Sequence, residues 1–183
     1  MAKTKHQPER VGIFVDIQNL YHSAKNIHHS RVNYKELIRN LVGRRQLIRA
    51  LAYVVKSDTV LESTVSRTTG RTEASFFEAL EKSGLELRVK DLQVFGSGAK
   101  KADWDVGLAV DAIRLAPSLD VVILVTGDGD FVPLIEYLRF GLSRRVEVAG
   151  FKGSSSSRLK DAADSFKNLE ALPRVLKKID IKR

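Results

Sequence analysis

Short apolar runs alternate with amphipathic stretches along almost the whole chain. The apolar runs predict strands, because they are short, rich in β-branched residues and followed at once by polar or turn residues. We expect strands over residues 11–16, 47–55, 85–94, 121–125 and 146–150. We expect helices over residues 19–27, 33–42, 72–83, 103–115, 131–140 and 154–166. Residues 56–71 and 95–102, rich in Ser, Gly and basic side chains, predict loops.

This alternation predicts an α/β fold, with a mostly parallel five-stranded sheet and helices on both faces. The length of 183 residues suits a single domain, and we find neither a repeat nor a linker that would divide it. We place the domain at residues 10–168, after a flexible basic N-terminus at 1–9. Residues 169–183 read as a basic C-terminal tail, for which a docking helix, a nucleic-acid arm and disorder all stay open.

Composition narrows the class of protein. The 31 Lys and Arg against 22 Asp and Glu give a net charge of +9, which favours a polyanionic partner such as nucleic acid or a membrane surface. The chain has no Cys, which excludes disulfides, a thiolate zinc site and a cysteine nucleophile. No apolar run approaches the ~18 residues of a membrane span, and the N-terminus lacks the apolar segment of a signal peptide. We therefore expect a cytoplasmic protein without membrane contact.

Acidic residues follow the predicted strands. Asp16 ends the first strand, Asp128 and Asp130 follow the fourth, and Asp103 and Asp105 begin the helix after the third. The carboxyl ends of parallel strands meet at one edge of a sheet, so we expect these acids to lie together. Clustered carboxylates raise one another's pKa unless a cation neutralises them. Mg²⁺ or Mn²⁺, which take oxygen ligands, would do so.

Each acid also has a purely structural interpretation. Asp103 and Asp130 could cap the helices that they precede, and Asp105 lies in a first turn, where the helix dipole favours an acid. Asp128 could serve as a turn former in Thr-Gly-Asp-Gly. Asp16 is harder to explain in this way, because it directly ends a buried apolar strand. Taken together at one edge, the five acids favour a metal site.

Three motifs in order resemble the NYN domain, and more narrowly its bacterial LabA-like branch within the PIN-like nuclease superfamily. They are Val-Asp-Ile-Gln-Asn at 15–19, Lys-Ala-Asp-Trp-Asp-Val at 101–106 and Val-Thr-Gly-Asp-Gly-Asp-Phe at 125–131. The resemblance covers roughly residues 10–168 and implies that the first strand lies beside the fourth. It also implies metal ligands, namely Asp16, Asp105, Asp128 and Asp130.

The resemblance extends to two further polar positions. Asn19 matches a residue that orients a phosphate or a metal-bound water, and Lys101 matches a lysine that can contact phosphate. Family members often have Lys-Gly-Val-Asp where this chain has Lys-Ala-Asp-Trp-Asp. We take Asp105 as the matching acid. Asp103 would then be a helix cap or a residue that contacts the metal ligands without contacting the metal.

The function that these features predict is a metal-dependent ribonuclease, with one or two Mg²⁺ or Mn²⁺ ions, ~3.5–4 Å apart if both are present, activating water. The resemblance implies a 5′-phosphate product. Single-stranded RNA is the preferred substrate, and DNA stays open. The backbone would lie on basic residues near the acids, each of which could equally be ordinary solvated charge. These residues are Lys56, Arg67, Arg71, Lys100, Lys101, Lys152 and Arg158.

Other interpretations remain open from sequence. A nucleic-acid-binding regulatory protein with little or no turnover would keep the same fold and acids, whereas a phosphatase is disfavoured because Asp16-Ile-Gln lacks a second acid. Trp104 could stack on a base or pack against a loop. The histidines His22, His28 and His29 lack a third matched ligand, so we expect surface positions. A homodimer would lengthen the basic surface, though no feature of the sequence demonstrates one.

Overall fold

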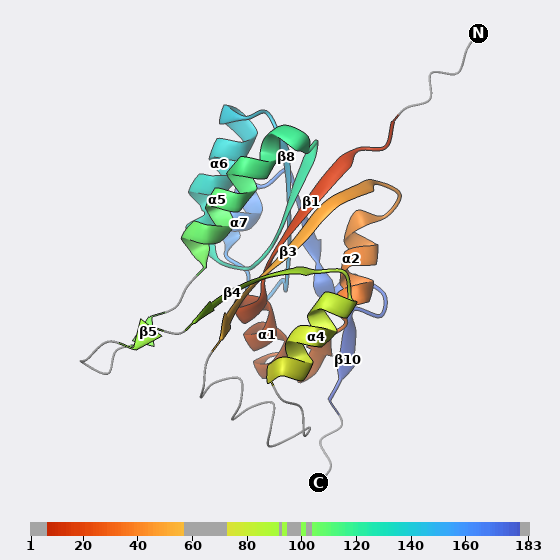
Figure 1. Ribbon diagram of the computed structural model, residues 1–183. Coiled ribbons are helices and arrows are strands. Elements are labelled where there is room, and N and C mark those ends of the chain that lie inside the picture. Colours follow the sequence, from red (N-terminus) through yellow and green to blue (C-terminus); the bar gives the residue numbers. More distant parts are fainter. Residues whose placement is uncertain (1–6, 57–72, 92, 95–99, 102–103, 180–183) are drawn as a thin grey trace.

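The structure is a computed structural model that describes residues 7–56, 73–91, 93–94, 100–101 and 104–179. Its centre is a six-stranded sheet in which every neighbouring pair is parallel, in the order β4-β3-β1-β7-β8-β9 (Figure 1). The strands are β1 (Arg10–Asp16), β3 (Gln46–Lys56), β4 (Glu86–Asp91), β7 (Val121–Val125), β8 (Arg145–Gly150) and β9 (Ser165–Asn168). The predicted α/β fold is confirmed, as is the placement of the first predicted strand, 11–16, beside the fourth, 121–125.

Two hydrophobic cores lie on the two faces of this sheet. In β1, Val11, Ile13 and Val15 point into one core and Phe14 points into the other, which is the alternation that a strand imposes. The first core is covered by α1 (Ile17–Asn26), α2 (Tyr34–Val42) and α4 (Glu73–Lys82). The second is covered by α5 (Asp105–Leu115), α6 (Val132–Glu136) and α7 (Ser157–Ala162). Strands β1 and β7 lie between these layers. All residues of β7 are buried, as are Val11–Val15 of β1.

The predicted count of five strands and the predicted helix over 154–166 are wrong. Helix α7 ends at Ala162, and Ala163 adopts an extended conformation. Residues Ser165–Asn168 then form β9, which pairs with β8 and packs Phe166 against the second core. The free edge of β8 and the burial of Phe166 therefore outweigh the helical pattern of the preceding residues.

The C-terminal segment packs against the domain. After a 3₁₀ turn at Leu169–Ala171, strand β10 (Leu176–Lys178) pairs antiparallel with β2 (Ser30–Val32). Val175 is fully buried in the first core, and its carbonyl accepts a hydrogen bond from the backbone N–H of Asn33 at 2.7 Å. Residues 169–179 thus continue the fold, where the sequence led us to expect a tail.

Smaller elements complete the described chain. A 3₁₀ turn (Gly129–Phe131) precedes α6, and a π-helical turn (Tyr137–Gly141) follows it, so the predicted helix over 131–140 is a composite. A second two-stranded ribbon joins β5 (Gln93–Val94) and β6 (Lys100–Lys101). Most of the predicted long loop over 56–71 lies outside the described residues. Within the described ranges, no helix has the length and apolar character needed to cross a membrane.

Candidate metal and nucleic-acid site

The order of the strands places the site. After β1, the chain adds β3 and β4 on one side of this strand. It then returns to the other side of β1 and adds β7, β8 and β9, so the strand order reverses between β1 and β7. Open parallel sheets bind ligands at the carboxyl ends of the strands that flank such a reversal. Asp16 ends β1 and Thr126 directly follows β7, so both lie at this point.

Asp16 is held by the start of α1 and by the loop after β7. It caps α1, since its Oδ1 accepts a hydrogen bond from the backbone N–H of Asn19 at 3.1 Å. Its Oδ2 accepts a hydrogen bond from the hydroxyl of Thr126 at 3.2 Å. Burial raises the pKa of the Asp16 carboxyl, these hydrogen bonds lower it in part, and the nearby charge of Asp128 raises it further.

Thr126 connects the two acids. It is buried, with 1% of its surface exposed, and its Oγ1 accepts a hydrogen bond from the backbone N–H of Asp128 at 3.2 Å. The carboxylate of Asp128 in turn caps the following 3₁₀ turn, because its Oδ1 accepts from the backbone N–H of Asp130 at 2.9 Å. A single hydroxyl thus fixes the loop that carries Asp128 relative to the carboxylate of Asp16.

Asn19 adds a second connection between the same elements. Its side-chain oxygen accepts a hydrogen bond from the backbone N–H of Gly127 at 2.9 Å. Gly127 is closely packed, since an added Cβ would lie 3.1 Å from Ser155 Oγ and 3.2 Å from the carbonyl oxygen of Ser154, which would have to shift slightly. The loop after β7 is therefore confined between α1 and the serine segment that follows β8.

The opposite wall of the site is aromatic. Tyr53 lies opposite Asp16 in the register of β3 against β1, and its ring meets Trp104 edge to face with centroids 5.6 Å apart. The indole N–H of Trp104 donates to the carbonyl of Val54 at 2.8 Å. An added Cβ on Gly107 would lie 2.4 Å from the Trp104 ring, so this glycine lets the ring lie on the first turn of α5. Trp104 therefore packs against its neighbours, the second of the two predicted interpretations.

These walls enclose a pocket of about 200 Å³. Four predicted site residues line it together, namely Asp16, Asn19, Asp105 and Asp128. Sequence reasoning did not assign the other lining residues, which are Gln18, His22, Tyr53 and Trp104, to a metal site. His22 could have been found from its spacing, because it follows Asn19 by three residues on the same helical face.

The remaining predicted residues either do not line the pocket or are not described by the structure. Asp130 is exposed and does not line the pocket. Lys56, Lys152 and Arg158 are exposed, on β3, after β8 and on α7 respectively. Lys100 and Lys101 form β6, whose backbone alone is described. Asp103, Arg67 and Arg71 fall outside the described residues.

The donor set of the pocket suits a hard cation in part. Its side-chain oxygens come from three carboxylates, two amides and the Tyr53 hydroxyl, and carboxylate and amide oxygens are ligands that Mg²⁺ and Mn²⁺ prefer. Over the described ranges, neither Asp16 nor Asp128 forms an ion pair with a Lys or Arg, so their charge is left for another cation to neutralise. Within those same ranges, however, no three acidic or histidine side chains are grouped closely enough to hold an ion by themselves. The arrangement therefore fits an ion with few protein ligands and several waters, as Mg²⁺ commonly has.

Comparison with known proteins agrees with the fold. The NYN domain family model matches residues 10–170, and the chain belongs to this family. The family is part of the PIN-like nuclease superfamily, which relates the chain to nucleic-acid chemistry.

Two individual proteins resemble the whole chain. The protein "Low amplitude and bright protein LabA" from Synechococcus elongatus is 22% identical over 182 residues, which cover 95% of this chain and 91% of LabA. The crystal structure of VPA0982, a protein of unknown function from Vibrio parahaemolyticus, superposes with a TM-score of 0.79 at 30% identity. That likeness covers 96% of this chain and 100% of VPA0982, so the described fold is shared from end to end.

Proposed function

We propose that this protein is a divalent-metal-dependent ribonuclease that hydrolyses phosphodiester bonds, preferably in single-stranded RNA. The observation that carries the proposal is the half-buried pair of Asp16 and Asp128 at the strand-order reversal, joined through Thr126 and without a basic partner among the described residues. Neighbouring carboxylates without a counter-ion repel each other, and a bound cation would relieve that repulsion. Membership of a nuclease superfamily supports the same assignment.

Asp16 and Asp128 would hold Mg²⁺ or Mn²⁺ directly, with Asp105 acting through water from the opposite wall. The ion would supply a nucleophilic hydroxide and stabilise charge on the phosphate. Thr126 and the backbone of α1 hold Asp16 in one orientation, so its oxygens need no rearrangement when substrate arrives. Asn19, already bonded to Gly127, presents its amide at the pocket and can orient a phosphate oxygen. Asp130 would act at most from the outer rim.

The test is cleavage of 5′-labelled single-stranded RNA in the presence of Mn²⁺. We expect labelled fragments that end in a 3′-hydroxyl, with the 5′-phosphate on the downstream fragment, and we expect them to disappear with EDTA and in Asp128→Asn. The matched control is Asp161→Asn, which removes an exposed acid of α7 outside the pocket and leaves cleavage at the wild-type rate. Undiminished cleavage by Asp128→Asn would refute the proposal and identify a contaminating nuclease.

A second candidate is a nucleic-acid-binding regulatory protein with little turnover. It is favoured by one observation, namely that no three acidic or histidine side chains in the described ranges are grouped around one ion position. RNA binding without cleavage, in any of Mg²⁺, Mn²⁺ or Ca²⁺, would support this candidate. Release of phosphate from small monoesters with the RNA left intact would instead indicate a phosphatase.

A further inference from the structure

The ribbon of β2 and β10 carries positive charge on its outer face. Lys177 lies directly opposite Arg31 in the antiparallel register, and both side chains are exposed. Like charges directly opposite each other destabilise a strand pair. The ribbon therefore keeps a local repulsion that an anion would relieve.

Helix α1 adds a third cation beside this face. The Lys25 ammonium lies 5.9 Å from the centre of the Tyr21 ring. Burial raises the pKa of the Tyr21 hydroxyl, and the positive charge of Arg31 lowers it in part. Lys25 and Arg31 lie on neighbouring elements, because β2 packs along α1. We call the set of Tyr21, Lys25, Arg31 and Lys177 the ribbon face.

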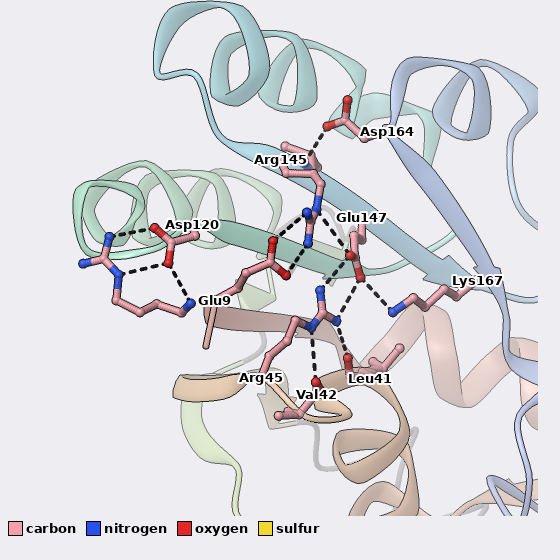
Figure 2. Close-up of polar contacts among 11 residues, drawn as sticks. Glu9, Leu41, Val42, Arg45, Asp120, Arg145, Glu147, Asp164 and Lys167 are labelled. Atoms are coloured by element: carbon pink, nitrogen blue, oxygen red, sulfur yellow. Dashed lines mark hydrogen bonds and ion pairs between the residues drawn. The ribbon is translucent and has the colours of Figure 1, made fainter. Parts of the chain in front are cut away.

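The cations of the ribbon face differ from those at the amino edge of the sheet. There, Arg45 and Lys167 both pair with the buried carboxylate of Glu147, at 2.7 and 2.8 Å, and Arg145 pairs with Glu9 at 2.7 Å (Figure 2). By contrast, none of the three cations of the ribbon face has an acid within ion-pair distance in the described part of the chain. Their charge is available to an external anion.

The ribbon face is continuous with the pocket through α1. Asn19 and His22 of this helix line the pocket, while Tyr21 and Lys25 belong to the ribbon face. From Asn19 to Lys25 the helix rises only about 9 Å. Strand β2 packs along α1, and β10 pairs with β2. A strand of a few nucleotides that leaves the pocket over α1 would therefore reach Arg31 and Lys177.

We propose that the ribbon face binds the sugar-phosphate backbone of the RNA that extends beyond the pocket. The identity of the polyanion rests on the proposed function. Contacts from Lys25, Arg31 and Lys177 to phosphates would hold the strand without reading its sequence. The C-terminal segment would then contribute substrate affinity in addition to completing the core.

The test measures binding of fluorescently labelled single-stranded RNA by anisotropy in EDTA, where uncompensated pocket acids repel RNA and the basic surface dominates. Wild-type protein should bind RNA of about 20 nucleotides several-fold more tightly than RNA of about 6, and the gain should fall with salt. The double variant Arg31→Gln/Lys177→Gln should lose that gain. Its slope of log affinity against log salt should be smaller by about 1.4, which is two phosphate contacts at about 0.7 each.

Two further variants separate this effect from net charge and from misfolding. Arg44→Gln/Arg114→Gln removes the same charge from exposed positions before β3 and at the end of α5, and should keep the wild-type slope. The charge-preserving pair Arg31→Lys/Lys177→Arg should keep it too. The inference is overturned if Arg31→Gln/Lys177→Gln, folded by circular dichroism, binds long RNA with the wild-type slope. It is also overturned if this variant loses binding to anionic vesicles but keeps its binding to RNA.

Failure here and failure of the proposed function can be told apart. The binding experiment contains no divalent ion and requires no cleavage. A smaller salt dependence of RNA binding in Arg31→Gln/Lys177→Gln would therefore support the ribbon face even if the protein never hydrolyses RNA. Conversely, cleavage that depends on Asp128 would stand even if the ribbon face proved irrelevant to binding.

Discussion

The side-chain oxygen of Asn19 accepts a hydrogen bond from the backbone N–H of Gly127 at 2.9 Å, across 108 residues of sequence. This bond joins the first turn of α1 to the loop after β7. The hydroxyl of Thr126 makes the parallel connection, since it donates to Asp16 and accepts from the N–H of Asp128. Together these bonds hold the two central acids of the site in a fixed relationship before any ligand binds.

Replacement of Asn19 tests that relationship. Asn19→Ala leaves the N–H of Gly127 without its partner, so we expect the free energy of unfolding to fall by about 1–3 kcal/mol. RNA cleavage should fall further, by about 10–100-fold, as is typical when a group that orients metal ligands is lost. Urea unfolding and cleavage rates measure the two effects. Asn26→Ala, at the exposed end of the same helix, is the control and should change neither.

Gly150 tests the packing behind the pocket. An added Cβ would lie 2.5 Å from Ser155 Oγ and 2.9 Å from the backbone carbonyl of Thr126. Gly150→Ala should therefore lower the free energy of unfolding by about 1–3 kcal/mol, the cost of overpacking, and should displace the loop that carries Asp128. Gly153→Ala, where an added Cβ meets nothing within 4 Å, should stay within about 0.5 kcal/mol of wild type. Equal stabilities of the two variants would contradict this packing.

Asp120 makes the free energy of unfolding depend on pH in the acidic range. Hydrogen bonds from the Arg10 guanidinium and from the Arg10 backbone N–H lower the pKa of Asp120 from 3.8 to about 2. Because the pKa is lower in the folded state, the charged carboxylate stabilises the fold above about pH 4, and this stabilisation disappears as the pH falls through 2. The stability difference between wild type and Asp120→Asn should therefore shrink between pH 5 and pH 2 in urea unfolding. A difference that is independent of pH would refute the assignment.

Asp16 should behave in the opposite sense. Burial raises the pKa of its carboxyl above the unfolded value, so the folded protein binds the proton more tightly and this group disfavours folding as the pH rises through that pKa. In EDTA at neutral pH, Asp16→Asn should be at least as stable as wild type in thermal unfolding, although it removes a hydrogen-bonded side chain. A clear destabilisation by Asp16→Asn in EDTA would mean that the carboxylate is structural.

Much of the fold could be predicted from hydrophobic pattern alone. The uninterrupted apolar run Val121–Val125 is the clearest prediction of a buried strand in the chain, and it forms the centre of the sheet as β7. Asp16 and Asp128 could be predicted to lie at the same edge of the sheet, because parallel strands all end at their carboxyl edge. The pattern failed at β9 and β10, short strands whose conformation is set by pairing with β8 and β2 rather than by local sequence.

The composition of the pocket was harder to predict than its location. Tyr53 enters it only through the register of β3 against β1, and register is a tertiary property that a single sequence does not specify. Thr126 gains its role from two hydrogen bonds, one of them to a residue 110 positions away. Asp130 follows Asp128 so closely in sequence that the two could not be distinguished, yet the 3₁₀ turn directs only Asp128 to the pocket.

The central claim is that the pocket between Asp16 and Asp128 binds a divalent cation. Calorimetric titration of Mn²⁺ at neutral pH tests this claim without RNA and without turnover. We predict binding to wild-type protein and to the control Asp161→Asn, and loss of that binding in both Asp16→Asn and Asp128→Asn. Binding of Mn²⁺ to those two variants with wild-type affinity, or no binding to the wild-type protein, would contradict the account.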